Sequence, residues 1–280
     1  MQRFIIITSV FVFLVTNPSP TSAQQAKQDS VIAARFNRAV GLYETHDDSG
    51  EALEEAEKEF AAVLKLNPRH APARAYQGLI ALGNQKPEVA EAAFRDALGF
   101  DPNCPEARVG RVRLFRQRRQ WAESYKEAHL AVQLAPTSIL ARWELVSVLL
   151  HRAEAPVTDA ERTEATPHLQ KIIDLDPDAR QAHLVLAELY ERQKRLRDAI
   201  THYNEVLRIG QTEEDMDVWV YEINNTVAGC YERLGDYPQA IEFLKQYLDA
   251  LKELGADEET LKATEQRIAE LQKKSSGKNR

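Results

Sequence analysis

A small side chain recurs along this chain at a spacing that few folds can accommodate. Its occurrences are Ala56, Ala90, Ser124, Ala165, Ala199 and Ala240. Successive members of this series lie 34, 34, 41, 34 and 41 residues apart. A near-constant period of this length is typical of proteins built from stacked repeats, in which each repeat is one supersecondary unit.

Prolines keep the same spacing. Pro68, Pro102, Pro136 and Pro177 each follow twelve residues after one of the first four small residues. Because proline disfavours helical backbone in the residue before it, each of them marks the end of a helix. Two amphipathic patterns of roughly 14 residues fit into each period. The sequence therefore predicts a unit made of a helix, a turn and an antiparallel helix.

The period and its positions resemble the tetratricopeptide repeat. The fifth unit, residues 180–211, has the family's residue types at positions 7, 8, 11, 20, 24 and 27, namely Leu186, Ala187, Tyr190, Ala199, Tyr203 and Val206. The sixth unit, from Tyr221, matches it as well, with Ala228, Tyr231, Gly235, Tyr237, Ala240 and Leu244. The resemblance implies an all-α fold, a right-handed superhelical solenoid of about six helix-turn-helix units over residues 34–252.

The units are not identical in length. Seven-residue insertions fall in the fourth repeat and before the sixth, and Thr158 to Glu161 reads as a capping box that restarts a helix after the first of them. We expect residues 24–33 to form a linker and 257–274 a capping helix that covers the last unit. Residues 275–280 are then a disordered basic tail.

The first 23 residues differ from everything after them. Arg3 gives a weak positive start, Phe4 to Val15 is almost entirely apolar, and small residues end at Ala23. This order is typical of a secretory signal peptide, residues 1–23. The apolar run is shorter than the roughly 20 residues of a transmembrane helix, and retention as an uncleaved anchor stays open as the alternative. We expect an exported protein, periplasmic or secreted, with no stable membrane insertion after cleavage.

The overall charge is acidic. Removal of the signal peptide would leave 35 basic and 43 acidic side chains, a net charge of −8, which argues against nucleic acid as a partner. Cys104 and Cys230 fall in distant units, so we expect two unpaired cysteines, with a reactive thiol or an intermolecular bridge as alternatives.

Residue patterns that carry chemistry are scarce. The seven histidines show no metal-ligand spacing, and no nucleophile elbow, phosphate-binding glycine loop or dinucleotide fingerprint occurs in the sequence. We therefore predict no catalytic residue, no metal and no cofactor. The sequence favours a binding protein over an enzyme.

The family resemblance implies a binding surface. In the family, positions 2, 5, 9 and 12 of each first helix point into a concave groove that holds an extended peptide or a partner helix. The groove candidates in this chain are Leu79, Val109, Arg113, Arg116, Trp143, Ser147, Leu184, Glu188 and Asn225. The middle of the groove is thus expected to be aromatic and basic.

Six arginines crowd the third unit: Arg108, Arg111, Arg113, Arg116, Arg118 and Arg119. They could clamp the carboxylates of an acidic partner, or they could pair with glutamates of adjacent units, and the sequence leaves both open. Trp143 is likewise either a contact anchor or part of the core.

Some relatives bind the acidic tails of heat-shock chaperones through basic and asparagine side chains at defined positions of three consecutive units. This chain has Leu42 and Gly110 where asparagine is needed, and Tyr76 in the second unit also departs from that pattern. The sequence therefore predicts a different use of the groove. The leading hypothesis is an exported adaptor that binds a protein or peptide segment, with a self-assembling structural module as the alternative.

Overall fold

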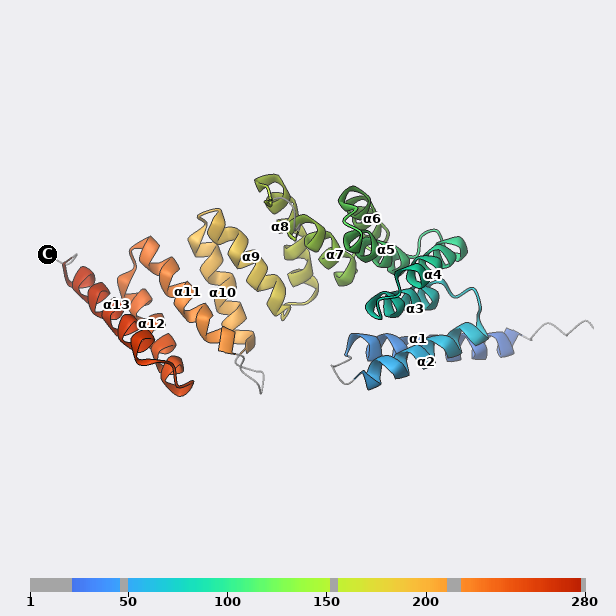
Figure 1. Ribbon diagram of the computed structural model, residues 1–280, viewed down its shortest axis with the longest axis horizontal. Helices are drawn as coiled ribbons and strands as arrows, with labels where there is room; N and C mark the ends of the chain where they lie inside the picture. Colours follow the sequence, from blue (N-terminus) through green and yellow to red (C-terminus); the bar gives the residue numbers. More distant parts are fainter. Residues whose placement is uncertain (1–21, 46–49, 152–155, 211–217, 278–280) are drawn as a thin grey trace, which may run out of the picture.

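The computed structural model describes residues 22–45, 50–151, 156–210 and 218–277. These residues form an all-α fold (Figure 1). The helices are α1 (Ser22–Glu44), α2 (Glu51–Leu66), α3 (Ala71–Gly83), α4 (Pro87–Phe100), α5 (Pro105–Gln117), α6 (Trp121–Leu134), α7 (Ile139–Leu150), α8 (Asp159–Leu175), α9 (Arg180–Arg192), α10 (Leu196–Gly210), α11 (Val218–Leu234), α12 (Tyr237–Glu253) and α13 (Glu258–Gly277).

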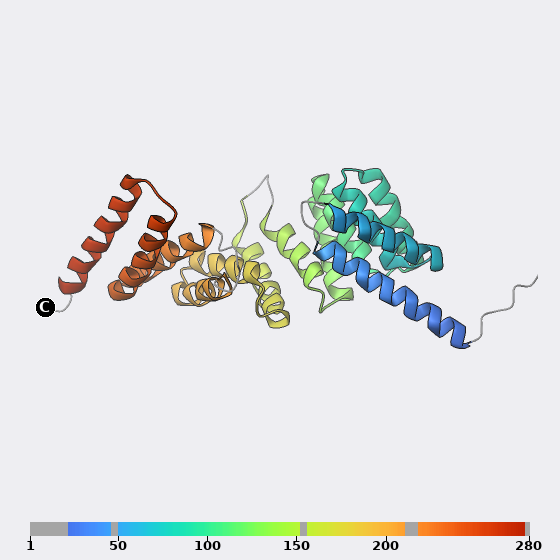
Figure 2. The same cartoon turned by 90° about the horizontal axis from the view of Figure 1, so that it is seen from below.

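Consecutive helices pack in pairs, from α1 with α2 to α11 with α12, and α13 packs against α12. Each pair also packs against the first helix of the next pair, and α3, α5 and α7 contact one another in sequence. Figures 1 and 2 show the resulting elongated stack, with α1 and α13 at its opposite ends. The predicted six-unit helical solenoid with a terminal capping helix is confirmed.

The recurring small residues lie in the core between packed helices. All six members of the series are fully buried. Ser124 also donates a hydrogen bond to the Val112 carbonyl oxygen at 3.0 Å, which satisfies its buried hydroxyl. The prolines lie two residues beyond the ends of α2, α4, α6 and α8, as the sequence predicts.

The closest packing surrounds Phe94 on α4. A Cβ atom at Gly78 of α3 would lie 2.5 Å from the ring, and one at Gly110 of α5 would lie 2.1 Å from it. Phe94 is itself fully buried, so the ring cannot move aside without opening a void. Two glycines thus let one aromatic side chain join the second and third units.

The turn between the two helices of a unit requires a left-handed residue. Gln85, Arg119 and Lys194 have φ near +60°, and Gly235 has φ of 74° at the equivalent position of the sixth unit. Only glycine adopts this region without a steric cost, so three units carry a small strain that the repeat geometry imposes.

The fourth unit restarts after its insertion as predicted. Thr158 Oγ1 accepts a hydrogen bond from the Glu161 backbone N–H, and the Glu161 carboxylate accepts one from the Thr158 backbone N–H. This reciprocal capping box begins α8. The sixth unit's first helix is also lengthened, because α11 begins at Val218, three residues before Tyr221.

Both ends of the chain differ from expectation. Residues 24–33 are not a linker but the first half of α1, where Ile32 is buried and Gln28 donates to the Leu66 carbonyl oxygen. Their alanine, glutamine and lysine content favours helix. At the other end α13 includes 275–277 of the predicted tail. The predicted signal peptide, apart from Ser22 and Ala23 in α1, lies outside the described residues.

Candidate functional site

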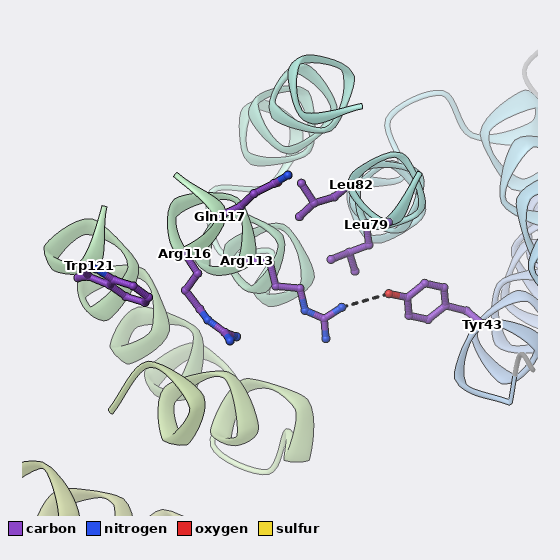
Figure 3. Close-up of a pocket in the computed structure, with 8 residues that line it drawn as sticks. Tyr43, Leu79, Leu82, Arg113, Arg116, Gln117 and Trp121 are labelled. Carbon is purple, nitrogen blue, oxygen red and sulfur yellow. Dashed lines mark hydrogen bonds between the residues drawn. The ribbon is translucent and has the colours of Figure 1, made fainter. Parts of the chain in front are cut away.

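An open pocket of about 610 Å³ lies between the first helices of the second and third units (Figure 3). We call it the groove pocket, and its lining residues are Tyr43, Leu79, Leu82, Gly83, Arg113, Arg116, Gln117 and Trp121. Leu79 and Leu82 come from α3, and the two arginines come from α5. Figure 3 shows both guanidinium groups directed into the space between α5 and its neighbours.

A buried carboxylate on α7 holds both arginines of the groove pocket. Arg113 Nε donates to Glu144 Oε1 at 2.5 Å, and Arg116 Nη1 donates to Glu144 Oε2 at 3.1 Å. The Glu144 side chain is only 7% exposed. Burial alone would lower the pKa of Arg113, but the Glu144 carboxylate outweighs it and raises that pKa. Arg113 therefore stays charged.

The charges at this site do not cancel. Two guanidinium groups share one carboxylate, so the cluster carries one positive charge in excess. Arg113 Nη1 also donates to the Tyr43 hydroxyl at 3.2 Å, as the dashed line in Figure 3 shows. Through these bonds α1, α5 and α7, from three different units, fix the positions of the arginine side chains.

The structure brings together only some of the predicted groove residues. Leu79, Arg113 and Arg116 all line the groove pocket. Val109 does not lie on an open surface, because it is 1% exposed and packs with Ala131 and Ala141. Position 5 of the third unit is thus core, since α6 and α7 close over it.

The remaining candidates lie farther along the solenoid. Trp143 and Leu184 are half-buried and pack against the central core, and Ser147 is half-buried on α7. Glu188 lines a separate pocket of about 320 Å³ between α7 and α9. Burial raises its pKa, an effect that the nearby Arg192 opposes. Asn225 is engaged by the capping helix, because its Oδ1 accepts from Arg267 Nη1 at 2.6 Å.

Most of the arginine cluster pairs with glutamates of neighbouring helices. Arg108 and Arg111 both contact Glu127 on α6, at 3.0 and 3.1 Å. Arg118 contacts Glu91 on α4 at 2.7 Å. Of the two interpretations that the sequence left open, intramolecular pairing is what the structure shows, and only Arg113 and Arg116 also line the groove pocket.

Sequence reasoning missed four lining side chains and the carboxylate beneath them. Leu82 is at position 12 of the second unit, the same position as Arg116 in the third, so the register itself identifies it. Tyr43, Gln117 and Trp121 lie at positions that the family pattern does not assign to the groove. Glu144 is next to Trp143 in sequence, but nothing in the sequence indicates which arginines it meets.

The two cysteines are buried. Cys104 and Cys230 are unpaired and buried, as expected, and burial raises their pKa values to about 12 and about 11. Both are therefore protonated thiols at neutral pH. Among the described residues no group of three His, Cys, Asp or Glu could hold a metal ion. In the same ranges no helix is long and apolar enough to cross a membrane.

Solved structures with the same architecture include three that overlap most of the chain. PilF of Pseudomonas aeruginosa is 17% identical with a TM-score of 0.57, covering 81% of this chain and 93% of its own. PilW, described as a widely conserved type IV pilus biogenesis factor, is 18% identical with a TM-score of 0.55, covering 83% and 97%. YrrB, described as having an unusual peptide-binding site, is 17% identical with a TM-score of 0.52, covering 68% and 91%. At these identities the likeness shows the fold.

Family comparison gives the same result from sequence. One tetratricopeptide-repeat model matches residues 178–253, and a second matches 44–105 and 77–139. Together these matches span more than half of the 280 residues. No curated protein matches the chain. With six helix pairs in the register that the repeat requires, the chain belongs to the tetratricopeptide-repeat family, whose members are protein-interaction scaffolds.

Proposed function

We propose that this protein is an exported, non-catalytic adaptor that binds a segment of another protein in the groove pocket, within an assembly of the cell envelope. The observation that carries this proposal is the pocket itself, which is open, partly apolar and lined by two arginines with only one carboxylate between them. Open clefts that combine apolar walls with a few fixed polar groups are typical binding sites.

Two proteins of the same fold support different parts of the proposal by analogy. PilW, described as a pilus biogenesis factor, supports the envelope setting, and YrrB, described as having a peptide-binding site, supports binding of a peptide segment. The order of charge, apolar run and small residues in 1–23 independently favours export.

Site-specific photocrosslinking tests the use of the groove. A benzoylphenylalanine at Gln117, an exposed residue of the groove pocket, should form a saturable adduct with an envelope protein. The same group at Val89, an exposed position on α4 outside the pocket, is the matched control. An adduct at Val89 alone, or none at Gln117, would contradict the proposal.

The export part of the proposal has its own test. Mass spectrometry of the protein from its host should find a mature amino terminus at Gln24, and fractionation should place it outside the cytoplasm. A protein that starts at Met1 in the cytoplasm would disprove export and leave the groove proposal intact.

Self-assembly remains the alternative function. Sedimentation of the purified protein at increasing concentration separates the two, because a self-assembling module should form defined oligomers. A chain that stays monomeric and crosslinks through Gln117 would support the adaptor.

A further inference from the structure

We infer that the groove pocket selects an extended segment in which a carboxylate side chain is next to a large apolar or aromatic one. This inference rests on the adaptor function proposed above and names the chemistry of its partner. It follows from the charges, the donors and the apolar surface of the pocket.

The first step concerns charge. The eight lining residues include two arginines and no aspartate or glutamate. Glu144 neutralises one of the two guanidinium groups, and each of its oxygens is already bonded to one arginine. A second carboxylate would bring the cluster to neutrality. An incoming lysine or arginine side chain would be repelled, so the site discriminates by sign.

The second step concerns hydrogen-bond donors. A guanidinium group has five N–H donors. Arg116 uses one of them on Glu144, and Arg113 uses two, on Glu144 and Tyr43. The remaining donors belong to two planar groups whose positions Glu144 fixes in advance. Carboxylates match this arrangement, and charge-assisted bonds of this kind are about twice as strong as neutral ones.

The third step concerns the apolar part of the pocket. Leu82 is half-buried and exposes apolar surface of α3 beside the arginines, and Leu79, although buried, also lines the pocket. The rings of Tyr43 and Trp121 stand on opposite sides of the arginines in Figure 3. Because apolar area removed from water supplies binding energy, a large side chain adjacent to the carboxylate would occupy this apolar surface.

The fourth step concerns size. A volume of about 610 Å³ is within the range of about 300–1,000 Å³ that ligand pockets span, enough for a short stretch of peptide and not for a folded domain. The pocket is open to solvent, so the rest of an extended segment can continue outside it. A short linear motif in a partner therefore suits the site.

Four labelled hexapeptides test the inference directly. Their flanks are identical Gly-Ser pairs, and their central pairs are Phe-Glu, Phe-Gln, Ala-Glu and Phe-Lys. Fluorescence anisotropy with the full chain should show that the Phe-Glu peptide binds at least tenfold more tightly than the Phe-Gln and Ala-Glu peptides. The Phe-Lys peptide should not bind. The preference for Glu over Gln should shrink at high salt, because exposed charges are screened.

Protein variants show whether the groove pocket is responsible. Arg116→Gln leaves one arginine for Glu144, so it should remove the Glu-over-Gln preference without unfolding the site. Leu82→Ala should instead reduce the Phe-over-Ala preference. Arg118→Gln is the matched control, because Arg118 follows the same helix but pairs with Glu91 on α4. It should leave all four affinities unchanged.

The outcomes separate this inference from the adaptor function. Equal binding of the Phe-Glu and Phe-Gln peptides, no binding of any peptide, or an Arg118→Gln effect as large as that of Arg116→Gln would overturn the inference. If Gln117 still crosslinks to a partner in that case, the adaptor function stands. If Gln117 crosslinks to nothing, the adaptor function fails too.

Discussion

Arginine side chains form ion pairs with carboxylates in both halves of the solenoid. The number of arginines on each carboxylate differs between the amino-terminal half, α1 to α7, and the carboxy-terminal half, α8 to α13. In the amino-terminal half, Arg113 and Arg116 share Glu144, and Arg108 and Arg111 share Glu127 on the neighbouring helix. Each of these carboxylates is buried beneath two guanidinium groups. Each of these two clusters therefore carries one positive charge in excess, and the arginines of the Glu144 cluster line the groove pocket.

The carboxy-terminal half shows a different ratio of arginine to carboxylate, since Arg208 alone contacts two carboxylates, Asp178 and Glu205. Arg233 of α11 contacts Glu191 at 2.6 Å, and Arg267 of α13 contacts Glu232 at 2.6 Å. Arg267 also donates a hydrogen bond to a neutral group, the Asn225 side-chain oxygen. The same repeat geometry thus leaves an excess of positive charge in the amino-terminal half, whereas in the carboxy-terminal half carboxylates neutralise the arginines. Equivalent repeat positions need not have equivalent roles.

The largest effect that should distinguish the halves is loss of Glu144. Glu144→Gln leaves two partly buried guanidinium groups without a counter-charge, and we expect a destabilisation of about 3 kcal/mol. Glu232, at 25% exposure, is the matched site in the other half, and Glu232→Gln should cost about 1 kcal/mol or less. Urea unfolding followed by circular dichroism measures both. An equal loss of unfolding free energy in the two variants would mean that the number of arginines on a carboxylate does not affect stability.

The burial of Glu144 beneath both arginines also determines which substitutions can test binding in the groove pocket. Reversing Arg113 and Arg116 together to glutamate would place three carboxylates at one buried site. Such a variant should unfold locally, and a loss of partner binding by it would say nothing about recognition. The single neutralising change at Arg116 avoids the problem.

A second difference between the halves is steric. Gly110→Ala would place a methyl group 2.1 Å from the Phe94 ring, and we expect a loss of about 1–3 kcal/mol. The equivalent positions farther along hold Val185 in place of Gly110 and Leu169 in place of Phe94, and Leu169 belongs to the central core, against which Val185 packs. Phe94→Leu should therefore relieve part of the Gly110→Ala cost, which a double-mutant cycle measures.

The control for this steric argument is Gly99→Ala. Nothing lies within 4 Å of a Cβ atom at Gly99 in α4, so alanine there should be neutral or stabilising by up to about 1 kcal/mol. If Gly99→Ala destabilises as much as Gly110→Ala, the cost is not due to Phe94.

A smaller effect is expected at the junction of the two halves. Thr158→Ala removes the cap that begins α8 after the insertion, at an expected cost of about 1 kcal/mol. Thr158→Ser keeps the hydroxyl and should retain most of the stability. The urea midpoint reports both, and a serine variant as unstable as the alanine variant would mean that the threonine methyl group, not the cap, matters.

The sequence was sufficient for the fold and for part of the site. The 34-residue period of small residues and prolines fixed the helix pairs, and the Thr158 cap was visible as a local pattern. The cap can be predicted because it depends on residues within one helical turn, and the helix pairs because every unit repeats the same positions. Three residues of the predicted groove, Leu79, Arg113 and Arg116, line the groove pocket, and their part in binding stays a prediction.

What the sequence could not predict depends on packing between units. Val109 and Asn225 are both at position 5, yet α7 buries one and α13 bonds the other. Glu144 meets Arg113 across 31 positions of sequence, because α5 packs against α7. Such pairings are set by how one unit stacks on the next, which a pattern within a single unit does not specify.

The smallest predicted effect is a loss of stability in acid that both halves share. Burial lowers the pKa values of His70 in the amino-terminal half and of His168 and His202 farther along. A lowered pKa means that the folded state binds fewer protons than the unfolded state. The contribution of these residues is therefore present above about pH 6.5 and is lost as the pH falls below it.

The contacts of two of these histidines explain the sign and provide the test. His70 Nδ1 accepts from the Ala73 backbone N–H, and His202 Nδ1 lies 3.0 Å from His183 Nδ1, so one proton at most fits between those rings. The carboxylates of Asp198 and Glu205 favour the charged form of His202 but do not outweigh burial and His183. The urea midpoint should fall between pH 7.5 and 5.5, and His202→Gln should reduce that fall more than a change at the exposed His151 does. If the two variants respond alike, the pair of His183 and His202 is not the source, and the acid sensitivity belongs to His70 or His168.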